Sequence, residues 1–280
     1  MFNEAVTRLL EQIALELSAP EVVFPTSFEL TIRVQALLKD PNVSIEKLSE
    51  FIGTEPLMSS RIIAYANSAA LRGVGPEIVD LHSAIMRIGL DAVRSVSYTL
   101  AVEQLIRSKH MLPFQDLSSK IWEHSLAVAA IARRLARQSR MNAEKAFFMG
   151  MVHDIGAFYL LFRCSMNEEI AKDREVLIQL VYYWHDGIGH ALLSAMNQSE
   201  DILTAVQDHE APTSIDNLRN WTSLLSCADW LGQQLVDWAP EELRAQRPHT
   251  ISETLFDAAA QAEILDQTRE EMASLRSSLF

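Results

Sequence analysis

The chain has 280 residues, of which 49% are hydrophobic and 22% charged, with only 9 Gly and 9 Pro, and this balance excludes collagen-like and low-complexity proteins. Asp and Glu (37) outnumber Lys and Arg (24), and the net charge of −13 argues against non-specific binding to nucleic acid or to an anionic membrane. Two cysteines, Cys164 and Cys227, cannot build a disulfide framework, so we expect a cytoplasmic protein.

Residues 1–17 are predicted to form an amphipathic helix and not a signal peptide. Three glutamates interrupt the apolar positions, and no basic start precedes an apolar run. The most apolar segment of the chain, residues 147–162, contains His153 and Asp154 and is too short and too polar to span a bilayer. We therefore expect no membrane partner.

Capping residues mark the helix boundaries that follow. A helix is expected to end at Asp40, because the residue before a proline is pushed out of the α region. Ser44 can cap the next helix, and Thr54 is expected to cap the one after it, with Pro56 in its first turn. The glycine-rich residues 72–76 then form a clear break.

Apolar residues recur at helical spacing nearly everywhere, as in residues 57–71, 83–106 and 121–136, and no segment shows sustained period-two alternation. We therefore predict an all-α fold. A break at residues 110–118, around Pro113, divides it into two helical lobes. An apolar pattern near the C-terminus predicts a further helix that packs within the chain. The predicted division is an N-terminal lobe, a second lobe and a C-terminal extension packed on the second lobe, over residues 1–112, 113–235 and 236–280.

One basic cluster stands out in the acidic second half. It consists of Arg133, Arg134, Arg137 and Arg140. We predict that it is the solvated face of a helix, and the alternative is an anion-binding patch.

Histidines and carboxylates also gather in the second half. His153 and Asp154 lie within a very apolar segment, where an unpaired charge is costly, so a metal or a buried ion pair must compensate. A lone histidine such as His124 is more often a hydrogen-bonded core residue, and the whole set therefore carries the argument. Imidazole and carboxylate groups are natural ligands of Fe, Mn, Mg or Zn, held as one or two ions. The candidate metal ligands are His124, His153, Asp154, His185, His209, Glu210 and Asp229.

The order of these residues matches a family. His124, then His153-Asp154-Ile155-Gly156, then Asp229 resembles the HD superfamily of metal-dependent phosphohydrolases. Segments of the first half are similar to the opening of the HDOD domain, an HD-related output domain. These segments are residues 24–25, 38–44, 55–58 and 66–69. The resemblance extends over about residues 18–215.

The resemblance implies that the second lobe is an HD-like helical bundle with a divalent metal site. It also implies a bacterial, cytoplasmic protein of signalling or gene regulation. Its partners would be signalling proteins, with homo-oligomers allowed and no nucleic acid expected. In such a site His124, His153, Asp154 and Asp229 would hold a first metal ion. His185 and His209, with Glu210, would hold a second.

The sequence departs from active relatives at two positions. Ala157 stands where those enzymes often carry a lysine that contacts phosphate, and Glu210 stands where a second histidine is expected after His209. Residues 211–220 also lack the Gly-Tyr-Pro motif of cyclic-di-GMP phosphodiesterases, so that activity is not expected.

Three interpretations follow. The leading one is a regulatory module that acts through protein contacts, with a largely retained metal site and weak or no hydrolase activity. The alternative is a metal-dependent phosphohydrolase acting on a phosphomonoester or nucleotide, with Asp154 as its catalytic carboxylate. The third is a structural remnant in which these groups hydrogen-bond to one another.

Overall fold

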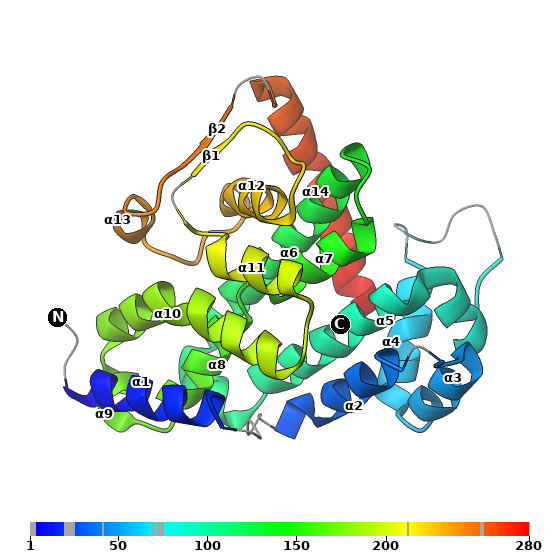
Figure 1. Ribbon diagram of the computed structural model, residues 1–280, viewed down its shortest axis with the longest axis horizontal. Coiled ribbons are helices and arrows are strands. Elements are labelled where there is room, and N and C mark those ends of the chain that lie inside the picture. Colours follow the sequence, from blue (N-terminus) through cyan, green and yellow to red (C-terminus); the bar gives the residue numbers. More distant parts are fainter. Residues whose placement is uncertain are drawn as a thin grey trace.

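Helices make up nearly all of the computed structural model, which describes residues 4–19, 26–40, 42–68, 71, 76–211, 213–252 and 255–279 (Figure 1). Within this part of the chain the strands are β1 (Thr213–Ile215) and β2 (His249–Ile251), which pair in parallel over three residues. The prediction of an all-α fold is therefore confirmed. Predictions that fall on residues 1–3, 24–25, 41, 69–70 and 72–75 lie outside the described residues.

The first part of the chain is built around one long helix. Its elements are α1 (Glu4–Leu17), the 3-10 helix η1 (Thr26–Phe28), α2 (Glu29–Leu38), α3 (Ile45–Gly53), α4 (Pro56–Ala66) and α5 (Leu81–Ile106). Helices α2, α3 and α4 pack on α5. The side chain of Asp80 caps α5 by accepting a backbone hydrogen bond from Ser83 at 2.8 Å. A kink interrupts α5 at Gly89, whose φ of +79° carries no steric cost for glycine.

One predicted cap is present and one is not. The hydroxyl of Ser44 accepts a backbone N–H bond of 3.2 Å at the start of α3, as expected. Helix α4 begins at Pro56, but the cap position belongs to Glu55, which makes no side-chain cap bond. The prediction that Thr54 caps α4 is wrong, because its hydroxyl donates to the backbone oxygen of Phe51 at 2.7 Å and so completes the end of α3.

The second part is a helical bundle. The 3-10 helix η2 (Lys109–Phe114) lies at the predicted break before it. The helices that follow are α6 (Gln115–Gln138), α7 (Ala143–Val152), α8 (Ile155–Cys164), α9 (Glu168–Lys172), α10 (Arg174–Ala195), α11 (Glu200–Asp208), α12 (Trp221–Gln233), α13 (Glu241–Arg244) and α14 (Ala258–Leu279). Helix α6 packs against α7 and α12, and α8 packs against α10. This packing turns one face of each of these helices toward a shared interior.

Contacts between the parts are extensive. Helix α1 lies beside α9 and α10 (Figure 1), where Glu16 pairs with Arg163, so the first helix of the chain rests on the second part. Helix α5 packs against α7 and α8, and α14 lies against both α6 and α4. Because these contacts cross residues 112 and 235, the division of the chain at those limits stays a prediction.

Arg133 does not lie on a solvated helix face, and the prediction for this member of the basic cluster is wrong. Its side chain is 1% exposed. One guanidinium nitrogen donates to the hydroxyl of Tyr65 at 2.7 Å, and another pairs with the carboxylate of Glu271. The guanidinium also lies over the ring of Phe147, 4.4 Å from its centre. The reason is that α7 and α14 pack on α6, and Tyr65 of α4 reaches the same guanidinium.

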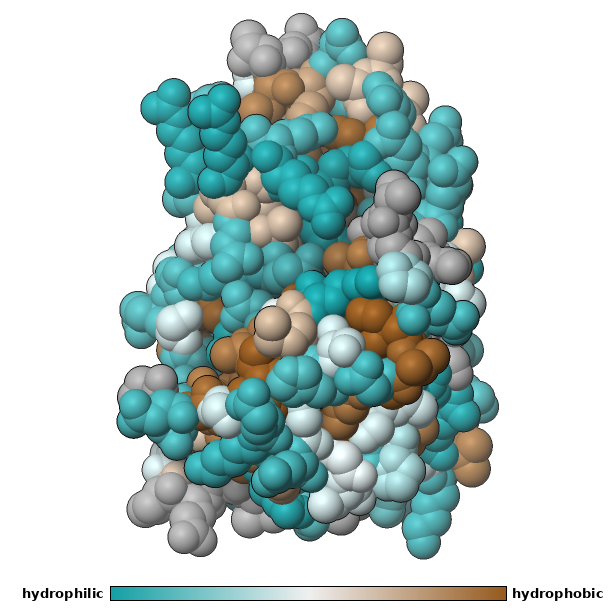
Figure 2. All heavy atoms as spheres, turned by 90° about the vertical axis from the view of Figure 1, so that its right-hand side faces the viewer, coloured by the Kyte–Doolittle hydropathy of each residue, from teal (hydrophilic) through white to brown (hydrophobic). Residues whose placement is uncertain are grey.

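One stretch of the described residues, Ala143–Cys164, is long and apolar enough to cross a membrane by length and composition alone. In the structure it is the pair α7–α8, and 89% of its most apolar window is buried inside the protein. This stretch is therefore a core segment. The face turned to the viewer in Figure 2 is mostly hydrophilic, with apolar side chains in patches between the polar ones.

Candidate metal centre

The seven predicted ligands meet in the interior of the second part of the chain. Their side chains are buried, and the most exposed of them is Glu210, at 7%. They are His124 in α6, His153 and Asp154 between α7 and α8, His185 in α10, His209 and Glu210 after α11, and Asp229 in α12. We call this set the metal-centre cluster.

Gly156 allows helices α8 and α10 to approach each other closely. A Cβ atom at this position would lie 2.0 Å from the backbone oxygen of His185 and 2.6 Å from the backbone nitrogen of Gly189. No side chain fits there, so the first turn of α8 lies directly on α10. This contact places Asp154, which precedes α8, beside the ring of His185.

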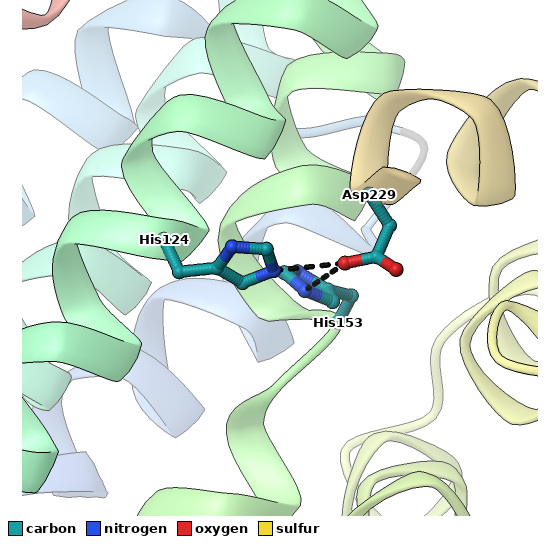
Figure 3. Close-up of side chains that lie close together, drawn as sticks. All are labelled: His124, His153 and Asp229. Atoms are coloured by element: carbon teal, nitrogen blue, oxygen red, sulfur yellow. Dashed lines mark hydrogen bonds and ion pairs between the residues drawn. The ribbon is translucent and has the colours of Figure 1, made fainter. Parts of the chain in front are cut away.

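The first group within the cluster joins α6, α7 and α12. Figure 3 shows the rings of His124 and His153 pointing toward the carboxylate of Asp229. Nε2 of His124 lies 2.8 Å from Oδ1 of Asp229, and Nε2 of His153 lies 3.7 Å from the same oxygen. The potential ligand atoms of these three residues all lie within 4.8 Å of one another, which is close enough to surround a single ion.

Two more groups of the same size overlap with the first. His153, Asp154 and His209 form one, and His185, His209 and Glu210 form the other. Because His153 and His209 are each shared between neighbouring groups, the cluster has room for one ion or for two adjacent ions. The structure thus brings all seven predicted residues together, while their role as ligands stays a prediction.

Three histidines direct an unprotonated nitrogen into the cluster. Nδ1 of His153, His185 and His209 lies 2.8, 2.9 and 2.7 Å from a backbone oxygen three residues earlier in the chain. A carbonyl oxygen can only accept a hydrogen bond, so Nδ1 carries the proton and Nε2 carries a lone pair. All three Nε2 atoms are buried, and none has a hydrogen-bond partner among the described residues.

The carboxylate of Asp154 faces two of these nitrogens. Its Oδ1 lies 3.3 Å from Nε2 of His185, and its Oδ2 lies 3.4 Å from Nε2 of His153. Lone pairs therefore face lone pairs across both gaps, and only a cation between them, a proton or a metal ion, makes the arrangement favourable. A histidine whose other ring nitrogen donates to a backbone carbonyl is typical of metal ligands, so these residues fit a divalent metal.

The protonation states also suit a metal. Burial lowers the pKa of His209 to about 4 and also lowers the pKa of His153, so both rings are neutral near pH 7. Burial opposes ionisation of Asp154 and Asp229, but the surrounding histidines hold the pKa of both carboxyls below the usual value. Neutral imidazoles and ionised carboxylates are the forms that bind metal.

The pKa values of the remaining three members of the cluster are raised and not lowered. Burial opposes protonation of His124, but its hydrogen bond to Asp229 and the negative charges nearby raise its pKa to about 9. Glu210 and Asp154 likewise raise the pKa of His185 in spite of burial. Burial raises the pKa of Glu210 to about 7, although His185 opposes this shift. Ligation by His124 and Glu210 would therefore displace protons.

Four groups that sequence reasoning missed contact the cluster from outside. The indole of Trp238 donates to Oδ2 of Asp154 at 3.0 Å, and the amide of Gln233 donates to Oδ2 of Asp229 at 2.8 Å. The backbone oxygen of Val236 accepts from Nδ1 of His124 at 2.9 Å. Arg247 pairs with Glu210 at 2.5 Å. No motif marks Val236, Trp238 or Arg247, whose contacts cross the fold, whereas Gln233 lies only four residues after Asp229 in α12.

A cavity of about 270 Å³ lies beside the cluster and reaches Glu210. Its other lining residues include Tyr182, Trp230, Arg244, Arg247 and His249. Arg247 also pairs with Asp186 at 3.2 Å, and Arg244 pairs with Asp237 at 2.5 Å. By contrast, Ala157 is completely buried in α8, and Arg163, the cation nearest to it in sequence, pairs with Glu16. The cations close to the cluster therefore come from the C-terminal extension.

Comparison with known proteins identifies relatives of the whole fold. The model of the HDOD domain family matches residues 24–212. A solved structure from Shewanella amazonensis SB2B, provisionally named a metal-dependent phosphohydrolase, is 26% identical with a TM-score of 0.72 and covers 99% of this chain and 100% of its own. An HDOD domain protein of unknown function from Geobacter sulfurreducens is 18% identical with a TM-score of 0.60, covering 98% and 97%.

A third structure, provisionally named a signal transduction protein, comes from Marinobacter aquaeolei VT8. It is 17% identical with a TM-score of 0.62 and covers 98% of this chain and 65% of its own. The chain spans about a third of the length of the curated sequence relatives it matches, 36% and 33%, at 19% and 20% identity. At identities below 25% these likenesses bear on the fold alone.

Proposed function

This chain belongs to the HDOD domain family, and from that premise we propose that it is a bacterial, cytoplasmic regulatory module that holds a divalent metal at the metal-centre cluster and acts through protein contacts. The observation that carries the metal proposal is the set of three buried, unpartnered Nε2 atoms on His153, His185 and His209. Buried nitrogen atoms without a hydrogen-bond partner are costly, and divalent cations bound between these rings and the neighbouring carboxylates would satisfy them.

Metal ligation divides among the residues as the family resemblance implies. His124, His153, Asp154 and Asp229 would hold one ion, and His185, His209 and Glu210 a second. A bound divalent ion supplies Lewis acidity toward a phosphoryl oxygen. The histidine Nδ1–H groups keep their rings oriented through bonds to the backbone, and the indole N–H of Trp238 holds one oxygen of Asp154.

Two features favour regulation over turnover. The histidines and aspartates of the cluster are at most 1% exposed, and closed metal sites are typical of structural centres, whereas catalytic centres keep an open position. In addition, position 157 provides no cation to neutralise charge that develops on a phosphoryl group. We therefore expect weak or no hydrolysis.

Titration calorimetry of the EDTA-treated 280-residue chain with Mn²⁺, Zn²⁺ and, under anaerobic conditions, Fe²⁺ tests the metal proposal. We expect binding of one or two ions and a rise in melting temperature. The His209→Gln variant should bind at least 100-fold more weakly. His190→Gln is the matched control, since His190 lies on α10 outside the cluster. Absence of binding by the native chain would contradict the proposal.

A second candidate is a metal-dependent phosphohydrolase acting on a phosphomonoester or nucleotide. The position of Arg247 favours it, because this cation pairs with Glu210 and lines the cavity beside the cluster. A screen of phosphomonoesters, nucleotides and cyclic dinucleotides with Mn, Fe, Mg and Zn decides between the two. Robust turnover that disappears in Asp154→Ala would replace the regulatory proposal with the enzymatic one.

A further inference from the structure

The segment between α12 and β2 contacts the metal-centre cluster from outside. The backbone oxygen of Val236 binds His124, the indole of Trp238 binds Asp154, and the guanidinium of Arg247 binds Glu210. These residues follow the region matched by the family model, which ends at residue 212. The outer contacts of the centre therefore come from residues beyond the part of the chain that the family model matches.

Trp238 makes the most constrained of these contacts. Its side chain is largely buried, and its Nε1 lies 3.0 Å from Oδ2 of Asp154. The ring stands nearly perpendicular to that of His185, with centroids 5.6 Å apart at 86°, and it also packs against Tyr182. An indole N–H only donates, so this geometry favours the ionised carboxylate and fixes which of its oxygens faces Trp238.

The orientation of this carboxylate matters because its two oxygens serve two different histidines. Oδ2 faces His153 and Oδ1 faces His185. Rotation about the bond to the carboxylate would break both alignments together. Holding Oδ2 with one hydrogen bond therefore also holds Oδ1, since the group is planar and rigid.

We propose that Trp238 is a positioning residue of the metal centre, which orients Asp154 toward His153 and His185 and thereby sets the affinity and coordination geometry of the bound ion. This inference rests on the proposed metal-binding function and adds a determinant from the C-terminal extension. Outer groups of this kind typically alter metal affinity by about 10- to 100-fold.

The test compares Trp238→Phe with the native chain and with Trp221→Phe. Phenylalanine keeps an aromatic ring and removes the N–H. Trp221 is the matched control because it begins α12 and its ring lies near Lys145, 5.2 Å away, outside the cluster. Calorimetry with Mn²⁺ should give about 10- to 100-fold weaker binding for Trp238→Phe and no more than a twofold change for Trp221→Phe.

A spectroscopic readout separates positioning from general destabilisation. At saturating Co²⁺, the visible absorption bands of Trp238→Phe should be shifted or changed in intensity, while those of Trp221→Phe match the native spectrum. Equal affinity and equal spectra for native and Trp238→Phe proteins would overturn the inference. If the native chain binds no metal, the proposed function itself fails, so the two failures are distinguishable.

A measurement on the native chain covers the case in which Trp238→Phe does not fold. The five indole N–H signals of protein labelled with ¹⁵N-tryptophan can be assigned from the variants Trp122→Phe, Trp184→Phe, Trp221→Phe and Trp230→Phe, which leaves Trp238 by elimination. We expect Zn²⁺ to shift the Trp238 signal more than that of Trp221. An unmoved Trp238 signal in zinc-loaded protein would refute the positioning role.

Discussion

Helix α6 carries two buried charged groups, His124 and Arg133, and the structure balances their charges in different ways. His124 belongs to the metal-centre cluster, and Arg133 lies about 13 Å further along the helix at ~1.5 Å per residue. Each is 1% exposed. The neighbours of Arg133 are Tyr65, Glu144 and Glu271, and we call these four residues the Arg133 cluster.

The two clusters differ in whether the protein itself supplies the opposite charge. In the Arg133 cluster one guanidinium faces two carboxylates and a phenol hydroxyl, so cation and anions meet directly, although Nε of Arg133 has no hydrogen-bond partner. In the metal-centre cluster, neutral nitrogens of His153 and His185 face the oxygens of Asp154. We call the Arg133 cluster complete, because it contains both the cation and its anions, and it holds helices together. We call the metal-centre cluster incomplete, because it needs a cation that the protein does not supply.

The largest expected effect comes from breaking the complete cluster. Arg133→Met leaves two carboxylates without their buried cation, and breaking a buried ion pair in this way costs about 3–5 kcal/mol. Urea unfolding followed by circular dichroism should show this loss, while calorimetric Mn²⁺ affinity stays within threefold of native. The exposed Arg137→Met is the control. A loss below about 1 kcal/mol would refute the structural role of the cluster.

The second largest expected effect is the stabilisation of the folded chain by metal bound at the metal-centre cluster. Metal present at 100 times its dissociation constant should stabilise the native chain by about 2.7 kcal/mol, because it binds only the folded state. Asp229→Asn removes a candidate ligand from α12 and should abolish this gain. Arg133→Met should retain it. If metal stabilised Asp229→Asn as strongly as the native chain, the assignment of Asp229 would be wrong.

Titration of His209 should make the free energy of unfolding depend on pH only when the centre holds no metal. Burial lowers the pKa of His209 to about 4 from 6.5, so as pH falls from 6.5 to 4 the unfolded chain binds a proton that the folded chain does not. His209 thus contributes a loss of stability across this window. Glu210, whose pKa burial raises to about 7, contributes in the opposite direction, so the native chain alone does not isolate the effect of His209.

The comparison that isolates it is His209→Gln in EDTA. Relative to the native chain, this variant should gain about 1–3 kcal/mol of unfolding free energy between pH 7 and pH 4.5. Urea denaturation at four pH values measures the difference. A difference that stays constant over this range would show that His209 titrates as it does in the unfolded chain.

The smallest expected effect is the reactivity of two buried thiols that stay neutral. Burial raises the pKa of Cys164 and of Cys227 to about 12, so little thiolate forms at pH 8. A disulfide reagent such as DTNB should therefore react with neither thiol in the native protein and with both in urea. Rapid reaction of one thiol without denaturant would indicate local opening around it.

The sequence by itself determined the fold class, several helix ends and the membership of the site. The all-α fold, the cap at Ser44 and the place of Pro56 in the first turn of α4 follow from side-chain spacing and from bonds within a few residues. The order of His124, His153-Asp154 and Asp229 selected residues that the structure brings together: the ligand atoms of His124, His153 and Asp229 lie within 4.8 Å of one another, and Asp154 forms a second such group with His153 and His209. The identity and number of the metal ions stay predictions.

Only the tertiary structure decided how buried charges are matched. Arg133 looks like a surface arginine in sequence, because its partners Tyr65 and Glu271 lie 68 and 138 residues away. Trp238 reaches Asp154 across 84 residues and has no motif of its own. Local spacing indicates which face of a helix is apolar, but the burial and partners of a polar side chain depend on which distant helices cover that face. That covering is a property of the packed chain, and no short segment contains it.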